Sequence, residues 1–443
     1  MHKFYNHYLG CYMPSFYYME LNFPFYSSSL ALYNLNKKNL STFIHEYIHF
    51  LQDISSYSLL NNAYVYSEYI HAATNCIYKL SKGKFNVPLE IPDNYGNIDL
   101  NKFINDTCMG DFSEMDNAFV KKVEFKRYKV PYKNDIVNEL EVPFLLLANG
   151  QKLRFGTCAI MESMAYLIER HITIGSSSPK DYPYKAAMAV VYLEYQEFGS
   201  DELNIIALCD MSLQFVNPGK IFVETLRMMK RENFLPDKAE DIYKYMYKLP
   251  VQQMGKYTNI AIGLINMGMM VQDRLKLYLN DPMFKEFHDT IRNFIGFGIG
   301  ERLRKPHFML DLVRNGFALY NKSLKLIMYN IGSPIIKDSQ NNFTQMPIVG
   351  QNANESLLFF PAIEQIYKCF KDGSTICEML DFCEETKKNA KDIFGDEWQN
   401  KVPIIDDNCW NSPWKKINDQ RLCPYAVLWK HWKLGDWEPT CSR

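Results

Sequence analysis

Thr42-Phe-Ile-His45-Glu46-Tyr-Ile-His49-Phe-Leu-Gln-Asp53 is the stretch that decides how this 443-residue chain is interpreted. Its apolar residues recur at the spacing of an amphipathic helix. His45 and His49 are four residues apart, so a helix places both imidazoles on one face, within reach of a single metal ion. The sequence therefore predicts a helix over residues 41–55 that carries a metal site.

Glu46 follows the first histidine, which completes the pattern H-E-x-x-H. A carboxylate in this position can hold a water molecule beside the metal and accept its proton. The plainer alternative is a helix with two ordinary histidines, either solvated or packed in a core. The helical periodicity and the lack of Pro or Gly in the segment favour the metal site.

Residues 41–55 resemble the active-site helix of the zincin metallopeptidases. In the metzincin branch, Gly and then His or Asp follow the second histidine at three and six residues, but here those places hold Gln52 and Ser55. The gluzincin branch takes a third ligand, Glu, from a separate downstream helix in the setting E-x-x-[AS]. Glu162-Ser-Met-Ala165 fits that setting, so the resemblance is gluzincin-like.

Glu162 lies in a stretch that is predicted to be helical over residues 158–170 and is otherwise apolar. A carboxylate among such residues needs a cation as partner, and Zn²⁺ would be one. Tyr166 stands where gluzincins often have an aspartate that supports the site, and Glu169, on the same helical face as Glu162, could replace it. The rivals for the ligand position are Glu194, Glu197 and Glu202, and also Glu68 or His71.

The resemblance implies one Zn²⁺ per chain, bound by His45, His49 and Glu162, with Glu46 as the general base. It implies a zinc-dependent peptidase that acts on a protein or peptide substrate. The donor that would stabilise the reaction's oxyanion is not fixed by the motif, and Tyr166 and Tyr195 are the candidates.

Two other interpretations stay open. Glu46-Tyr-Ile-His49 is followed by Glu68-Tyr-Ile-His71, and paired E-x-x-H motifs are typical of di-iron carboxylate oxidases. The two motifs are close in sequence, however, and His45 would have no role. The other alternative is a binding or regulatory protein without activity, whose metal site is structural or vestigial, with four protein ligands and no open position.

Composition limits the class of protein. The 49 basic and 50 acidic residues leave a formal net charge of −1, which does not indicate general nucleic-acid binding. Eleven cysteines at irregular spacing, without a C-x-x-C pair, favour reduced thiols. The longest apolar stretch, residues 260–271, is too short to span a membrane. We therefore expect a cytoplasmic protein without a membrane segment.

The pattern along the chain predicts a mostly helical α+β fold in two regions. Residues 1–230 would form the zincin-like region, with a β-hairpin over 142–157 whose turn is Asn149-Gly150. Residues 231–443 would form a helical region. Two segments, 82–120 and 331–355, are predicted to be irregular. Four residues of the Trp-rich end match no zinc module by spacing, so packing is expected there: Cys409, Cys423, His431 and Cys441.

Overall fold

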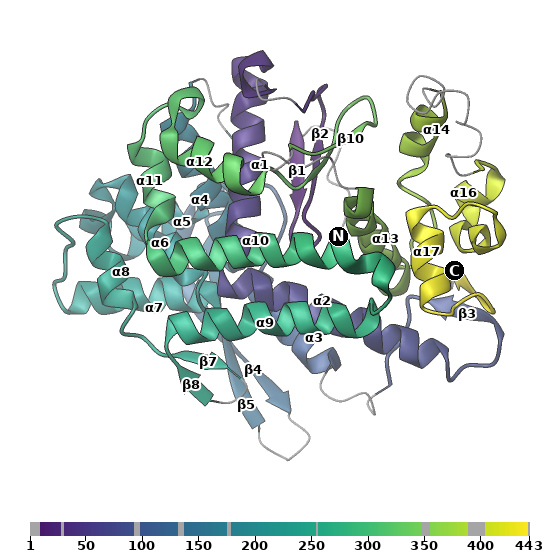
Figure 1. Ribbon diagram of the computed structural model, residues 1–443. Coiled ribbons are helices and arrows are strands. Elements are labelled where there is room, and N and C mark those ends of the chain that lie inside the picture. Colours follow the sequence, from purple (N-terminus) through teal and green to yellow (C-terminus); the bar gives the residue numbers. More distant parts are fainter. Residues whose placement is uncertain are drawn as a thin grey trace.

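The computed structural model describes residues 9–27, 31–92, 98–131, 137–174, 179–253, 256–346, 355–388 and 404–441. Over these residues the fold is α+β and mostly helical, as predicted (Figure 1). The α-helices are α1 (Lys37–Ser55), α2 (Tyr57–Ile77), α3 (Ile98–Met109), α4 (Thr157–Ile172), α5 (Ala186–Glu194), α6 (Glu202–Ser212), α7 (Pro218–Arg231), α8 (Glu240–Met246), α9 (Ile260–Tyr278), α10 (Lys285–Arg304), α11 (Phe308–Arg314), α12 (Lys322–Ile331), α13 (Phe359–Asp372), α14 (Leu380–Lys388), α16 (Asp407–Asn411) and α17 (Pro424–His431).

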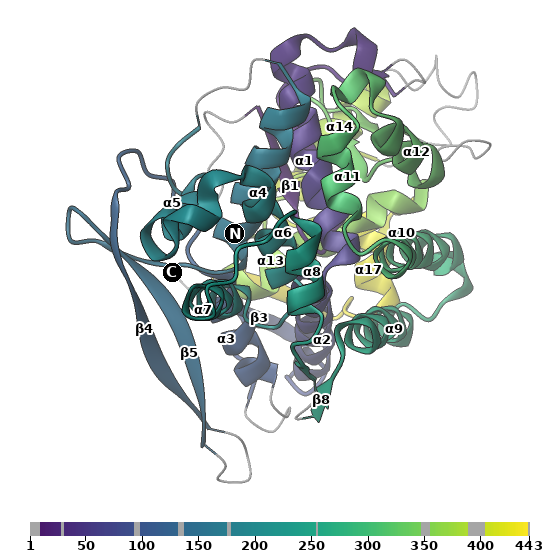
Figure 2. The same cartoon turned by 90° about the vertical axis from the view of Figure 1, so that its left-hand side faces the viewer.

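The strands form small separate sheets in the described part of the chain. They are β1 (Gly10–Met13), β2 (Tyr18–Leu21), β3 (Gly83–Val87), β4 (Val120–Pro131), β5 (Val137–Leu147), β6 (Lys152–Arg154), β7 (Val251–Gln253), β8 (Lys256–Thr258), β9 (Ile335–Lys337), β10 (Phe343–Thr344) and β11 (Trp437–Cys441). One sheet has the order β1-β2-β9-β10, with β2 and β9 parallel. β4, β5 and β6 form an antiparallel sheet, and β3 pairs with β11 in parallel. Figure 2 shows that β4 and β5 extend away from the helical body.

Helix α1 lies at the centre of the fold. The side chain of Asn36 caps its start by accepting a hydrogen bond from the backbone N–H of Asn39 at 2.9 Å. Its neighbours are α2, α4, α10 and β1, so side chains all around its second half are buried (Figure 1). A helix enclosed on all sides has little freedom to move, which suits an element that positions reactive groups.

Two glycines allow close approach to α1. A Cβ atom at Gly298 on α10 would lie 2.1 Å from the carbonyl oxygen of Ile54, and one at Gly10 on β1 would lie 2.7 Å from the side chain of Thr42. Any larger residue would force these elements apart. Gly298 therefore serves helix packing, and Gly10 brings β1 against the helix turn that holds Glu46.

The main sequence-predicted elements are present. The predicted helices over 41–55 and 158–170 correspond to α1 and α4, although α1 begins four residues earlier. The Asn149-Gly150 turn joins β5 to β6, and Gly150 has the positive φ of 85° that this turn needs. The prediction of an irregular segment over 82–120 was wrong, because β3 and the helix α3 lie there. The prediction of an irregular segment over 331–355 was also wrong, because β9 and β10 lie there. Residues 347–354 of this segment lie outside the described residues.

The expected division near residue 230 stays a prediction. Elements from both sides of it pack directly on each other, since α9 contacts α2 and α10 contacts α1. Among the described helices, none is both long and apolar enough to cross a membrane.

Candidate metal centre

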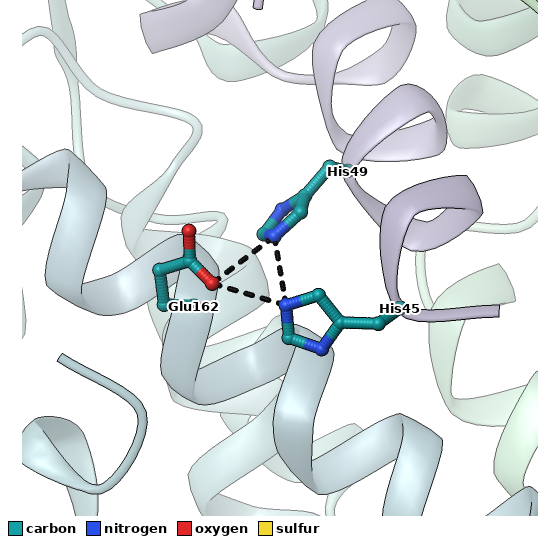
Figure 3. A group of neighbouring side chains, drawn as sticks. All are labelled: His45, His49 and Glu162. Atoms are coloured by element: carbon teal, nitrogen blue, oxygen red, sulfur yellow. Dashed lines mark hydrogen bonds and ion pairs between the residues drawn. The ribbon is translucent and has the colours of Figure 1, made fainter. Parts of the chain in front are cut away.

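Three side chains predicted as metal ligands meet at one point. His45 and His49 extend from α1 and Glu162 from the neighbouring α4 (Figure 3). Oε2 of Glu162 lies 3.0 Å from Nε2 of His45 and 3.2 Å from Nε2 of His49, and the two Nε2 atoms are 3.1 Å apart. Two imidazole nitrogens and one carboxylate oxygen thus face a common centre, which is a donor set that can hold a metal ion.

The other ring nitrogen of each histidine is held by a hydrogen bond. Nδ1 of His45 lies 3.0 Å from Oε2 of Glu169, and Nδ1 of His49 lies 2.8 Å from Oε1 of Gln52. Gln52 is itself fixed, because its Nε2 donates to the carbonyl oxygen of Met161 at 3.1 Å. A carboxylate or amide oxygen accepts a hydrogen bond from Nδ1–H, so in the neutral imidazole the lone pair of each Nε2 is directed to the centre.

The charges in the centre act strongly on one another. Burial lowers the pKa of His45, but the carboxylates of Glu162 and Glu169 outweigh it and raise that pKa well above its usual value. Burial raises the pKa of Glu162, but His49 and His45 outweigh it and hold that pKa far below its usual range. The centre is thus a buried anionic site that attracts a cation, either protons on the imidazoles or a metal ion.

The centre opens onto a cleft of about 500 Å³. His45, His49, Glu162 and Glu46 all line this cleft. Glu46 is 6% exposed, and burial raises the pKa of its carboxyl group, while His45 and His49 lower it. The H-E-x-x-H glutamate is therefore next to the two histidines and accessible from the same space.

Tyr184 is a cleft residue that the sequence did not single out. Its ring centroid lies 5.7 Å from that of His45, and its hydroxyl donates to Oε1 of Glu114 at 3.1 Å. Burial, followed by the charges of Glu162, Glu114 and Glu46, raises the pKa of Tyr184, so the phenol keeps its proton. No short-range pattern marks this tyrosine, because it reaches the site through tertiary packing from the segment before α5.

The two tyrosines named as oxyanion donors do not line the cleft. The ring of Tyr166 lies against the guanidinium of Arg170 at 5.5 Å, and the hydroxyl of Tyr195 donates to the carbonyl oxygen of Phe234 at 3.3 Å. Tyr166 lies one turn beyond Glu162 on α4. The structure thus gives no support to an oxyanion role for either residue.

Three of the rival glutamates have ion-pair partners elsewhere, and Glu197 is exposed and does not join the centre. Glu194 forms an ion pair with Arg227, and Glu202 with Arg170 and His171. Glu68 pairs with Arg274 at 2.7 Å, and the ring of His71 lies 6.1 Å from that of Tyr278. In the described part of the chain, Glu68 and His71 do not join the centre, so the geometry does not favour a di-iron site.

The centre could hold a metal ion, with the carboxyl group of Glu46 and the phenol of Tyr184 lining the same cleft. Comparisons of the chain with protein-family models, with curated proteins and with solved structures found no match. The function is therefore inferred from the chemistry of the centre and its cleft.

Proposed function

We propose that the protein is a zinc-dependent peptidase whose catalytic centre is formed by His45, His49, Glu162 and Glu46. The observation that carries this proposal is the meeting of three ligand atoms at the wall of a cleft that Glu46 also lines. His45, His49 and Glu46 all lie on α1. Glu162 lies on α4, the helix that packs against α1.

The donor set fits zinc. Two imidazole nitrogens and one glutamate oxygen are the protein ligands of a well-known group of catalytic zinc sites, which leave a fourth position open. Harder cations such as Mg²⁺ and Ca²⁺ prefer sites made of oxygen alone. The bonds from Nδ1 of His45 to Glu169 and from Nδ1 of His49 to Gln52 are of the kind that supports zinc-binding histidines.

Zinc held by His45, His49 and Glu162 would supply Lewis acidity, which would make a water molecule more acidic and polarise a substrate carbonyl. The chain supplies the proton transfers. Glu46 accepts a proton from the attacking water and passes it to the leaving amine. The hydroxyl of Tyr184, which burial keeps protonated, would exchange its hydrogen bond to Glu114 for one to the oxygen on which negative charge develops.

The cleft distinguishes this proposal from a structural metal site. Structural zinc sites are closed by four protein ligands. Among the described residues three ligand atoms meet here, and they line a cleft of about 500 Å³. An open position next to a buried carboxylate is the arrangement that hydrolysis requires.

The test compares Glu46→Gln with wild type. The substitution keeps the shape of the side chain and removes the base, so zinc content and fold should persist while peptide hydrolysis falls by roughly 10³-fold or more. Glu224→Gln, at an exposed glutamate of α7, is the matched control and should behave as wild type.

Because the substrate is not defined, cell lysate incubated with each zinc-loaded protein should be examined by mass spectrometry for new peptide termini. Termini that appear with wild type and with Glu224→Gln, but not with Glu46→Gln, would support the proposal. Termini that appear equally with Glu46→Gln would refute the mechanism. Their absence with zinc-loaded wild type would favour a non-catalytic metal site.

A further inference from the structure

The cleft carries more negative than positive side chains. Two cations line it, Arg154 and Lys371, against five carboxyl groups: Glu46, Asp106, Asp111, Glu114 and Glu162. A zinc ion at the proposed centre would offset two negative charges, since it would be bound by Glu162 and lie near Glu46. Three carboxyl groups of the cleft then remain, and their effect on a substrate depends on whether the protein already pairs them with a cation.

Two of these three carboxyl groups have a cation partner. The carboxylate of Asp106 forms an ion pair with the ammonium of Lys102 at 3.1 Å. The carboxylate of Asp111 accepts hydrogen bonds from the guanidinium of Arg154 at 2.8 and 2.9 Å, and from the backbone N–H of the same residue at 2.7 Å. The charges of Asp106 and Asp111 are therefore offset within the protein, which leaves Glu114.

Glu114 has a neutral partner instead. Its Oε1 accepts a hydrogen bond from the hydroxyl of Tyr184 at 3.1 Å, and in the described part of the chain it forms no ion pair. Lys180 acts on Glu114 through its charge, but the ion pair of Lys180 is with Asp116. Burial raises the pKa of Glu114, the bond from Tyr184 lowers it in part, and Glu162 raises it further. A cation that enters the cleft would meet a half-buried carboxylate that is not yet neutralised.

The position of Glu114 is fixed by the pairing of two segments. The backbone N–H groups of Met115 and Tyr182 each donate to the other residue's carbonyl oxygen, at 3.1 and 3.0 Å. The hydroxyl of Tyr182 also donates to the carbonyl oxygen of Asp111 at 3.0 Å. Glu114 and Tyr184 lie on either side of this pairing, so their side chains meet in the cleft from two segments that are joined through their backbones.

The proposed mechanism would take this hydrogen bond away from Glu114. The hydroxyl of Tyr184 would turn to the oxygen on which negative charge develops, so Glu114 would lose its donor while substrate occupies the cleft. A positively charged group of the substrate could replace that donor. An ammonium or guanidinium donates hydrogen bonds to a carboxylate and also offsets its charge, which a neutral group does not.

We propose that Glu114 binds a positively charged group of the substrate and makes the protein prefer peptides that carry such a group next to the scissile bond. This inference rests on the proposed peptidase function. Two sources supply the same chemistry: the α-amine of a peptide whose N-terminus lies in the cleft, and the side chain of a lysine or arginine beside the scissile bond.

Three hydroxamic acids test this preference without hydrolysis, because the hydroxamate group itself binds zinc. Norleucine hydroxamate carries a free α-amine, Nα-acetyl-lysine hydroxamate carries a side-chain ammonium, and Nα-acetyl-norleucine hydroxamate carries no cation. Calorimetry gives the Kd of each for the zinc-loaded full-length protein. We expect one or both cationic probes to bind wild type about 10-fold more tightly than the neutral probe, and the tighter of the two identifies the source.

Glu114→Gln should reduce this advantage to about two-fold or less, because the amide oxygen still accepts a bond from Tyr184 but carries no charge. Glu224→Gln, at the exposed glutamate of α7, should keep the full advantage. The neutral probe monitors the integrity of the site, since damage to the fold or to the zinc would weaken it together with the cationic probes.

Equal affinity of the three probes for wild type, or no binding of any, would overturn the proposal. So would an advantage that persists in Glu114→Gln. A preference for a cationic probe in protein that releases no new peptide termini from lysate would support the role of Glu114 and refute hydrolysis alone. Because binding of the probes needs no turnover, the two proposals are tested separately.

Discussion

Oε2 of Glu169 lies 3.0 Å from Nδ1 of His45, and Glu169 stands two turns beyond Glu162 on the same helix. Helix α4 therefore supplies both a candidate ligand and the group that orients a ligand on α1. Glu169 is held in turn by the hydroxyl of Ser41, which donates to its Oε1. The centre is thus built from two helices that fix each other's side chains.

Glu162→Gln should lose most of the metal affinity of the histidine centre. The amide is a poor zinc ligand and carries no charge, so two neutral imidazoles would remain. Zinc retained after dialysis against a chelator measures the loss, with Glu224→Gln as the matched control. Full retention in Glu162→Gln would remove Glu162 from the ligand set.

Glu169→Gln should have a smaller effect, because the residue acts through His45. We expect metal affinity at this centre to fall by about 10- to 100-fold, the usual result of losing a carboxylate behind a zinc-binding histidine. Competition with a chelator of known affinity measures it. An effect as large as that of Glu162→Gln would mean that the two roles are assigned wrongly.

Tyr184→Phe should lower kcat for peptide hydrolysis by about 10²-fold with little change in KM, because the hydroxyl acts on charge that develops in the transition state. Tyr166→Phe is the matched control, since Tyr166 does not line the cleft. Steady-state kinetics on a substrate found in the lysate experiment would separate them. Equal losses in both variants would argue against Tyr184 as the donor.

Local sequence was sufficient for the parts of the site that one helix contains. The spacing of His45, Glu46 and His49 and the apolar periodicity around them depend on helix geometry alone, so α1 and its arrangement could be predicted. Glu162 could be selected because it is a charged residue among apolar ones. Glu169 could be named as a possible support of the site from its seven-residue spacing to Glu162, and in the structure its Oε2 lies 3.0 Å from Nδ1 of His45.

Features that depend on tertiary packing could not be predicted. Tyr184 reaches the cleft from the segment before α5, and nothing in its neighbourhood distinguishes it from the other tyrosines. Helix α3 was missed because its sequence is polar and mixed, and packing against α2 stabilises it.

Arg302→Met should destabilise the fold by about 3–5 kcal/mol, because it leaves a buried carboxylate without its partner. Both amino groups of Arg302 bond to Asp210, at 2.6 and 2.7 Å, and both side chains are 1% exposed. Arg304→Met, two residues away at an exposed pair with Glu301, should cost less than about 1 kcal/mol. Chemical denaturation of both variants measures the difference; similar values would mean that the buried pair is not a major stabilising contact.

The ion pair between Glu240 and Arg314 should make stability depend on pH. Hydrogen bonds from Arg314 lower the pKa of Glu240 to about 2, from a usual value of 4.5. A lowered carboxyl pKa stabilises the fold above the unfolded value, and this stabilisation is lost as the pH falls through 4.5 towards 2. The pair lies near the surface, so solvent screening limits its contribution to about 1 kcal/mol.

Glu240→Gln should therefore lower the free energy of unfolding by about 1 kcal/mol near pH 7, and the difference from wild type should shrink as the pH falls from about 5 to about 2. Arg314→Gln should show the same dependence, and the double variant should lose little more than either single one. Denaturant titrations at each pH provide the measurement. A difference that stays constant across this range would show that the loss in Glu240→Gln does not come from the charge of Glu240.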